Sequence, residues 1–424
     1  SASGSASTGG SATGKQLSGK VVYWSMYNEG EPEAMAIQKA ADMFMEDYPD
    51  CEVEIQWIGR SNQDITGPAL EGGEQLDILD NFSYDKSTDR YLDITEVITE
   101  PVLGQEDMTV AESILPVLNL ANAQGQEKAG LETDKYYGVQ MFPWVVGFFY
   151  NKDLFKQAGI TEPAKTWDEF FQQCDKLKAA GVTPLSMDTA DSAWVTQLWM
   201  GAMVGTESDA GLEFMNTMNP TDYNTPEMIA AAEKIQKMYQ NYTTQDAIGG
   251  KYENAANNFL SGQTAMLANG PWMIGDFSDT SMTEEGFADK VGVALFPGNF
   301  VYDAPIQGYI VTKQDDPKVE EAAIEMVKFF TSAEAQQTAM EMQGMVPASN
   351  TVELTDTAKD KYPLLAEFLD LATTEGEKRS DTLQATMYAN LLDVMSQQLP
   401  LLASGELDAK GFCQTLTDAA AKNQ

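Results

Sequence analysis

Residues 257–277, NNFLSGQTAMLANGPWMIGDF, contain the pattern that decides the fold. The sequence predicts the end of a helix over 255–260, a stop at the Ser-Gly pair 261–262 and a short buried strand over 264–267. Residues 269–271, Asn-Gly-Pro, follow and are typical of a helix cap with proline at the first helical position.

Trp272 is placed at the start of the second predicted helix, where backbone N–H groups have no partner within the helix. A flat indole beside such donors suits a polar ligand with one apolar face, such as a sugar ring. The alternative is that Trp272 anchors the core, because tryptophan is mostly buried in folded proteins. The sequence leaves both interpretations open.

The run FLSGQTAMLANGPWM, residues 259–273, resembles the signature of the family 1 extracellular solute-binding proteins of carbohydrate ABC importers, the group that includes maltose-binding protein. Further stretches resemble the same family in the same order, and the resemblance spans nearly all of residues 20–350. The family implies an α/β fold with two lobes, each a mostly parallel sheet flanked by helices, and a ligand cleft between the lobes. The further stretches are 21–49, 137–154 (YGVQMFPWVVGFFYNKDL) with 166–170, and 291–313.

The start of the chain predicts a strand–helix–strand unit. Residues 21–26 form a short apolar run, Pro32 marks a helix start, and residues 53–57 alternate as a second strand. A unit of this length implies a right-handed crossover and a parallel sheet. The apolar residues on one face of the intervening helix are Ile37, Ala41, Phe44 and Tyr48.

Pro143 separates two apolar runs, 138–142 and 145–150, and its missing N–H disfavours one continuous central strand. We therefore expect the chain to pass between domains there. From Glu334 onward the pattern is almost entirely helical. The other predicted elements are strands over 76–79, 182–187, 291–296 and 308–312, helices over 151–159, 166–180, 194–204, 226–242 and 318–330, and a loop over 297–307.

The resemblance implies three passages between lobes, near Pro143, Phe296 and Phe330. The predicted first lobe comprises 20–143 and 296–330. The predicted second lobe comprises 144–295 and 331–424, with the C-terminal helices. Residues 1–19 are predicted to be a disordered Ser/Gly-rich tether.

The first fourteen residues, SASGSASTGGSATG, lack apolar anchors. Such a tether resembles that of bacterial lipoproteins, in which a lipidated cysteine would precede Ser1; alternatively, the first residues are not native. The expected location is the extracellular face of the cell membrane of a Gram-positive type of bacterium, as a lipoprotein, or the periplasm.

Composition excludes several classes of function. Lys and Arg total 26 and Asp and Glu total 65, and the resulting charge of −39 repels nucleic acid and anionic lipid. The absence of histidine excludes Ser-His-Asp, Cys-His and HExxH sites. Cys51, Cys174 and Cys413 have no metal-ligand spacing and are interpreted as small buried residues, and the 22 methionines as packing residues. We expect no metal and no cofactor.

Ligands of open α/β sheets bind beyond the carboxyl ends of the strands, and the loops there supply the candidate site. Carboxylates and amides accept sugar hydroxyls, while indole rings cover the C–H faces of a sugar. By resemblance, Asn28, Glu29, Asp80 and Asn81 match ligand positions of the first lobe, and Trp194 and Trp272 match aromatic platforms of the second. The predicted ligand-binding residues are Asn28, Glu29, Asp80, Asn81, Tyr84, Trp144, Asp191, Trp194, Trp272, Gln307 and Arg379.

Other roles are open for some of these residues. Asp80 and Asn81 also suit a helix cap, and Trp194 also suits core packing with Trp199. Trp57 is interpreted as a core residue. The apolar segment 144–147 is shorter than its maltose-type counterpart, and Asp80-Asn81 stands where that type has a tryptophan, so the resemblance predicts a sugar but not maltose.

The leading hypothesis is a monomeric, non-enzymatic binding protein that closes over an oligosaccharide and delivers it to the permease subunits of an ABC importer. One rival is a glycoside hydrolase, although no motif singles out the two carboxyl groups that such an enzyme needs. Another is a binding protein for a different solute, such as a polyamine or a peptide.

Overall fold

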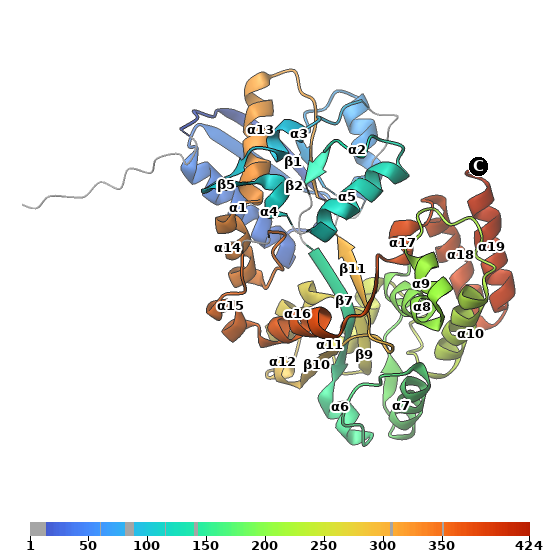
Figure 1. Cartoon of the computed structure of the whole chain (residues 1–424). Helices are drawn as coiled ribbons and strands as arrows, with labels where there is room; N and C mark the ends of the chain where they lie inside the picture. The colour runs from blue at the N-terminus through green and yellow to red at the C-terminus, as the bar shows by residue number, and fades with distance from the viewer. Residues whose placement is uncertain are drawn as a thin grey trace, which may run out of the picture. The chain divides into compact units, whose positions relative to one another are not determined.

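The structure, a computed structural model, describes residues 14–59, 61–80, 89–114, 116–139, 143–305, 308–349 and 352–424. The chain divides into two compact units, whose elements are labelled in Figure 1. Unit 1 comprises Ser1–Pro143 and Pro305–Lys361. Unit 2 comprises Trp144–Ala304 and Tyr362–Gln424, so the first boundary lies at Pro143.

The second boundary follows Ala304, not Phe296 as expected. Strand β11 (Phe300–Pro305) lies beside β7 (Pro143–Asn151) in the sheet of unit 2 and keeps the chain there. The residues predicted as a loop, 297–307, therefore include a strand, and that prediction is wrong. The sheet position of β11 is defined by its neighbour β7, which the local sequence does not reveal.

The third boundary follows Lys361, not Phe330 as expected. Helix α14 (Ala333–Gln343) continues unit 1 because it packs against α1 (Pro32–Asp47). A helical pattern alone cannot indicate which of two units a helix covers, so the predicted boundary was placed too early.

The sheet of unit 1 has the strand order β2–β1–β3–β12–β6. Strand β1 is parallel to β2 and β3, which confirms the predicted strand–helix–strand unit, while β12 is antiparallel to β3 and β6. The sheet is thus mixed: β1, β2, β3 and β6 run in one direction, as expected of a mostly parallel sheet, and β12 runs against them. The bounds are β1 (Gly19–Ser25), β2 (Cys51–Trp57), β3 (Ile78–Leu79), β6 (Gly138–Val139) and β12 (Tyr309–Val311), with a separate antiparallel pair β4 (Pro101–Val102) and β5 (Gln105–Thr109).

Helices cover this sheet with the faces that the sequence predicts. The predicted apolar face of α1 is buried, and α13 (Pro317–Phe330) packs on β1 and β12 although it is distant in sequence from β1 (Figure 1). Helix α1 carries proline in its first turn, as predicted from Pro32, and α13 also begins with a proline, Pro317. The other helices of unit 1 are α2 (Asn62–Glu71), α3 (Thr95–Ile98), α4 (Val110–Ser113), α5 (Pro116–Lys128) and α15 (Asp356–Lys361).

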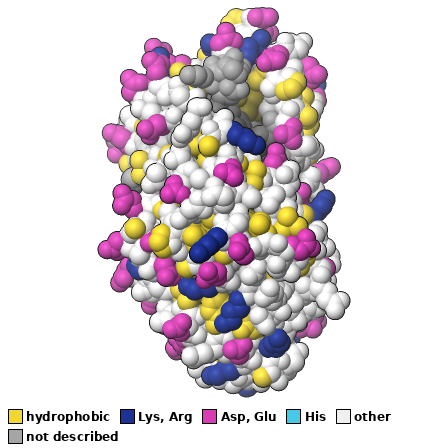
Figure 2. All heavy atoms as spheres, turned by 90° about the vertical axis from the view of Figure 1, so that its right-hand side faces the viewer, with side chains coloured by type: hydrophobic (Ala, Val, Ile, Leu, Met, Phe, Trp, Pro, Cys, Tyr) yellow, Lys and Arg dark blue, Asp and Glu magenta, His cyan; other side chains and the backbone are white. Residues whose placement is uncertain are grey.

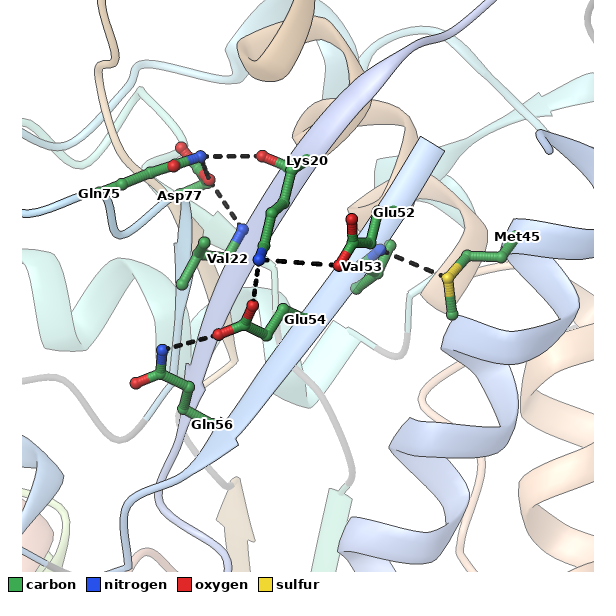
Figure 3. Close-up of polar contacts among 9 residues, drawn as sticks. All are labelled: Lys20, Val22, Met45, Glu52, Val53, Glu54, Gln56, Gln75 and Asp77. Carbon is green, nitrogen blue, oxygen red and sulfur yellow. Dashed lines mark hydrogen bonds and ion pairs between the residues drawn. The ribbon is translucent and has the colours of Figure 1, made fainter. Parts of the chain in front are cut away.

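Polar contacts hold β1 from both sides near its amino end (Figure 3). Lys20 lies opposite Glu52 in the β1–β2 register, and its ammonium group is 3.6 Å from that carboxylate and also pairs with Glu54. On the β3 side, the buried Asp77 accepts the backbone N–H of Val22 at 2.8 Å. Burial raises the pKa of Asp77. These contacts support the pairing of β1 with β2 and β3 at its amino end. The same pairing places the carboxyl ends of the three strands next to one another.

The sheet of unit 2 has the order β13–β11–β7–β9–β8, with β10 paired to β7. Strand β9 is parallel to β8 and antiparallel to β7, so this sheet is also mixed. Strands β7 and β11, which begin and end at unit boundaries, are neighbours in it. The remaining bounds are β8 (Thr183–Leu185), β9 (Thr264–Asn269), β10 (Val291–Ala294) and β13 (Lys378–Ser380).

Helix α8 (Trp194–Glu207) forms the centre of the helical layer of unit 2. Its residues from Val195 to Gly205 are all buried, and α9 (Asp209–Met215) and α10 (Pro226–Asn241) pack beside it (Figure 1). The other helices of unit 2 are α6 (Lys152–Gln157), α7 (Trp167–Ala179), α11 (Tyr252–Leu260), the 3-10 helix η1 (Pro271–Ser278), α12 (Phe287–Lys290), α16 (Pro363–Glu375), α17 (Leu383–Thr386), α18 (Asn390–Ser404) and α19 (Ala409–Ala421).

The predicted tether ends earlier than residue 19. Residues 1–13 lie outside the described residues, but Leu17 is only 4% exposed, and the Lys15 Nζ atom is 2.6 Å from Oε1 of Glu325 on α13. The Glu325 side chain is 2% exposed, and a buried carboxylate requires such a partner. The prediction of disorder is therefore wrong for the last part of this range.

The acidic surplus is dispersed on the surface. Figure 2 shows Asp and Glu side chains spread over the face it presents and not gathered in one patch. The three cysteines are free and buried, as predicted. Among the described residues, no helix has the length and apolarity needed to cross a membrane.

Candidate functional site

The carboxyl ends of β1, β2 and β3 meet at one edge of the sheet of unit 1, because these strands are parallel. The loop after β1 carries Asn28 and Glu29, both exposed. The Asn28 amide donates to Glu31 at 3.1 Å. A Cβ added to Gly59, in the loop after β2, would lie 2.9 Å from Oδ1 of Asn28. The structure therefore brings the predicted residues Asn28 and Glu29 to this edge with solvent-accessible polar groups.

Asp80 follows β3 at the same edge, but its side chain is 0% exposed. Its Oδ2 accepts the hydroxyl groups of Tyr23 and Ser25, the latter at 2.9 Å. Its Oδ1 accepts the backbone N–H of Met26 at 2.6 Å and the amide of Asn62 at 3.4 Å. Burial and the neighbouring carboxylate raise the pKa of Tyr23 well above its ordinary value. Contrary to the expectation of a ligand contact, Asp80 holds the loop after β1 and presents no acceptor to solvent.

Trp57 differs from its predicted role as a core residue. It is the last residue of β2 and pairs in register with Ser25, so it lies at the carboxyl edge of the sheet. Its side chain is only partly buried. Strand β2 is at the border of the sheet, and a side chain at the end of a border strand is covered on fewer sides than one on a central strand. The alternation of apolar residues over 53–57 predicted burial of Trp57, but alternation alone does not distinguish the end of a border strand from a position in a central strand.

Trp194 and Trp272 lie next to each other in unit 2. Their ring centroids are 6.4 Å apart at an interplanar angle of 48°, and both side chains are partly exposed. Trp199, by contrast, is 0% exposed and packs against Phe148 and Phe170. Neither Trp194 nor Trp272 is therefore a fully buried core residue. The two indoles form the aromatic pair of unit 2.

The Trp272 ring is held by its own cap residue and by α11. The indole folds over Gly270, where an added Cβ would lie 2.0 Å from Cζ3 of the ring. Its Nε1 donates to the hydroxyl of Tyr252 at 3.4 Å, and that hydroxyl also accepts the amide of Asn269 at 2.8 Å. Tyr252 is partly exposed beside the pair. No motif in the sequence pointed to Tyr252, because only the tertiary fold brings the start of α11 to Trp272.

Trp194 is the first residue of α8, and the loop before it is unusual. Asp191 and Ala193 have positive φ angles of 55° and 52°, in the left-handed region that such residues rarely adopt. The backbone N–H of Thr189 donates to the carbonyl of Gly250 at 3.1 Å. The loop before α8 is thus tied to the loop before α11, and these two helices carry Trp194 and Tyr252. Asp191, a predicted site residue, is exposed in this loop.

Arg379 has a structural role in unit 2, in contrast to its predicted place at a ligand site. Its guanidinium forms a bidentate pair with Asp303, both contacts at 2.7 Å, which joins β13 to β11. It also donates to the carbonyls of Ala372 and Gly376 at 2.6 and 3.2 Å, at the end of α16. The hydrogen bond to Asp303 raises the pKa of Arg379. The Nε, Nη1 and Nη2 atoms of Arg379 thus all donate within unit 2, although the side chain is 34% exposed.

Other predicted residues fall outside the description. Asn81, Tyr84 and Gln307 are not among the described residues, and Trp144 is described only as part of β7 and not by its side chain. In the described part of the chain, no group of three or more His, Cys, Asp or Glu side chains is arranged to hold a metal ion.

Two α/β units joined by three chain passages, with polar and aromatic side chains on loops at helix and strand ends, define the class of two-lobed binding proteins. The chain belongs to the family of bacterial extracellular solute-binding proteins, which it matches over residues 28–337. The family resemblance predicted from the sequence is confirmed. One curated relative is the sn-glycerol-3-phosphate-binding periplasmic protein UgpB of Brucella melitensis, 23% identical over 277 residues. The match covers 62% of this chain and 61% of the relative, so the chain spans about three-fifths of that protein's length.

Solved structures confirm the predicted α/β fold with two lobes. A chitin oligosaccharide binding protein superimposes with a TM-score of 0.79 at 20% identity, covering 96% of this chain and 98% of the other. The maltose-bound MalE3 of T. maritima gives a TM-score of 0.74 at 19% identity, covering 96% of this chain and 100% of the other. At this level of identity the similarity concerns the fold.

Proposed function

We propose that the protein is the extracellular substrate-binding component of an ABC importer and that it binds a carbohydrate, an oligosaccharide. The observation that carries this proposal is the aromatic pair, Trp194 and Trp272, with both rings partly exposed and 6.4 Å apart. Indole faces suit the C–H surfaces of sugar rings. The names of the two solved structures, which refer to a chitin oligosaccharide and to maltose, support the same ligand class.

Charge favours a neutral ligand over a phosphorylated one such as the sn-glycerol 3-phosphate in the name of the Brucella relative. The exposed predicted residues Asn28, Glu29 and Asp191 offer amide and carboxylate groups, while the Arg379 guanidinium is paired with Asp303. A carboxylate accepts hydrogen bonds from hydroxyl groups but repels a phosphate, which is ordinarily bound by Arg, Lys or a helix N-terminus. These side chains therefore suit a polyhydroxylated, uncharged solute.

Under this proposal a closed form made stable by the ligand is recognised by the permease subunits. Such closure requires contacts that exist only in the closed form, because a ligand with equal affinity for both forms shifts nothing. The Ser/Gly-rich start of the chain would serve as the tether of a membrane-anchored lipoprotein, and the protein would act as a monomer without a cofactor and without binding nucleic acid.

The proposal assigns no catalytic step to the protein. A glycoside hydrolase needs two carboxyl groups facing one bond, about 5–10 Å apart. Asp80, the acidic residue nearest the end of β3, is 0% exposed and cannot serve in such a pair in this structure. Incubation with oligosaccharides followed by product analysis tests this assignment, and the release of shorter saccharides by the purified protein would contradict it.

The test of the ligand class is a thermal-unfolding panel of oligosaccharides, glycerol phosphates, peptides and polyamines, followed by titration calorimetry on each hit. A ligand at about 100 times its dissociation constant adds about 2.7 kcal/mol to the free energy of unfolding, which is readily detected as a rise in melting temperature. We expect this rise with an oligosaccharide and one binding site per chain. Stabilisation by a phosphate, peptide or polyamine and by no saccharide would refute the proposal.

Replacing Gly270 with alanine is expected to weaken saccharide binding although Gly270 itself offers no side chain to a ligand. The backbone of Gly270, with φ −120° and ψ 177°, is open to alanine, so the effect comes from the collision of the new Cβ with the Trp272 ring. Turning the ring away should cost about 1 kcal/mol or more of binding free energy, about fivefold in affinity. Calorimetry measures the loss. Gly67→Ala in α2, with nothing within 4 Å of its added Cβ and without a left-handed backbone, is the control for a changed glycine that should leave affinity unaltered.

A further inference from the structure

The residue that precedes helix α8 does not cap the helix with its side chain. The residue before it, Ala193, has φ 52° and ψ 47° and no polar side-chain atom. An N-cap residue ordinarily has an extended backbone and a side-chain oxygen that accepts the N–H of the second or third helical residue. Helix α8 starts with Trp194, so whatever replaces the missing cap also determines where this indole lies.

Asp188, in the loop after β8, supplies the missing acceptors. Its Oδ1 accepts the backbone N–H of Thr196 at 3.1 Å, and its Oδ2 accepts that of Val195 at 3.4 Å. These are the third and second residues of α8, the donors that a local cap would bind. Asp188 is 1% exposed, and burial raises its pKa to about 7 although both N–H donors favour the charged form. The buried Asp188 carboxyl group therefore accepts the backbone N–H groups at the start of α8.

The rest of Asp188 is fixed by α10 and by α8 itself. The hydroxyl groups of Tyr239 and Thr196 donate to the Asp188 carbonyl at 2.5 and 2.6 Å. Gln197 on α8 donates to the carbonyl of Ser192 and holds the intervening loop. A left-handed backbone at a non-glycine residue persists only where its surroundings fix it. The capping contacts of Asp188 and the Gln197 bond therefore account for the turn at Ala193.

We propose that Asp188 is a positioning residue for ligand binding: by capping α8 from a distance, it places Trp194 beside Trp272. The effect on affinity rests on the proposed carbohydrate function, whereas the effect on ring geometry does not require any ligand. Without the Asp188 acceptors, the first turn of α8 loses two backbone hydrogen bonds, and the Ala193 turn loses the contacts that stabilise it. Trp194 then moves with the first turn, while Trp272 stays on η1.

The first test measures the ring geometry in the absence of ligand. Two indoles at 6.4 Å give an exciton couplet in circular dichroism whose amplitude falls steeply with separation and changes with angle. Trp167 and Trp199 form a second indole pair at 6.4 Å, so the couplet of Trp194 and Trp272 is measured as the difference between the wild-type spectrum and that of Trp272→Phe. We expect Asp188→Ala to reduce the couplet strongly and Asp188→Asn, which retains one acceptor oxygen, to reduce it less. Asp175→Asn is the control for the loss of a carboxylate charge in unit 2, because Asp175 is exposed and accepts the hydroxyl of Tyr242 on another element than α8.

The second test measures the affinity for the saccharide found in the ligand panel. Asp188→Ala is expected to bind about tenfold more weakly and Asp188→Asn about threefold more weakly, with Asp175→Asn at the wild-type value. If Asp188→Ala does not fold, the Asn variant decides by the same two measurements. A wild-type couplet in the Asp188 variants, or an affinity within about twofold of wild type, would overturn the inference.

These outcomes separate the inference from the proposed function. If the wild-type protein binds no saccharide, the carbohydrate function fails, and an unchanged couplet in Asp188→Ala would still overturn the positioning role. If wild type binds and the Asp188 variants bind equally well, the function stands and Asp188 has no part in it.

Discussion

Replacing Trp272 with alanine is expected to weaken saccharide binding at least about tenfold while the protein stays folded. The ring is partly exposed, so its removal leaves no large internal cavity. A sugar that covers about 60 Å² of the indole loses about 1.5 kcal/mol at about 25 cal/mol per Å², which corresponds to about a tenfold change. Titration calorimetry gives the affinity, and thermal unfolding shows whether the variant is intact.

Two further variants make this result specific. Trp272→Phe retains a flat ring and should recover part of the affinity. Trp167→Ala is the matched control, because Trp167 is also a partly exposed tryptophan at the first position of a helix in unit 2, but its Nε1 donates to Thr206 at 2.8 Å. Equal affinities of Trp272→Ala and wild type would remove the aromatic pair from the ligand site and with it the main support for a sugar ligand.

Replacing Asp80 with alanine is expected to destabilise the protein by about 3–5 kcal/mol. The carboxylate is 0% exposed and accepts the hydroxyls of Tyr23 and Ser25 and the N–H of Met26, so its loss leaves several buried donors without an acceptor. Each such donor costs about 1–3 kcal/mol, less what relaxation and entering water recover. Urea unfolding followed by circular dichroism measures the change in the free energy of unfolding.

The comparison variant is Asp93→Ala. Asp93 is exposed in the same unit, and its Oδ1 accepts both the N–H and the hydroxyl of Thr95, at 3.0 and 2.6 Å. Its loss should cost only about 1 kcal/mol, as for an exposed helix cap. A similar small cost for Asp80→Ala would mean that the Asp80 contacts do not hold the end of β1 to that of β3.

Local patterns in the sequence predicted most of the helices and strands. The apolar spacing of α1, the prolines that open α1, α10 and η1, and the buried strand β9 are all as expected. Only the type of the last helix differs, because η1 is a 3-10 helix. These features were predictable because capping, proline geometry and periodic burial are properties of a short stretch of chain.

Features that depend on a distant partner were not predictable in the same way. Part of the stretch predicted as a loop, residues 300–305, forms β11 beside its neighbour β7, and α14 belongs to unit 1 through its packing on α1. Within the candidate site, Asp80 and Arg379 have the polar chemistry that a ligand contact requires, but Tyr23, Ser25 and Asp303 use that chemistry inside the protein. Residue type alone does not distinguish a polar group that serves the fold from one that is left for a ligand.

The sequence by itself determined the α/β class, the family, and the two tryptophans and loop residues from which a site can be built, because these follow from residue types and their spacing along the chain. Only the tertiary structure decided that Trp194 and Trp272 pair at the surface while Trp199 is in the core, that Tyr252 joins them, and that Asp188 replaces the missing cap of α8. The physical reason is that exposure and hydrogen-bond partners are set by segments far apart in sequence, and each of these roles exists only after those segments have packed.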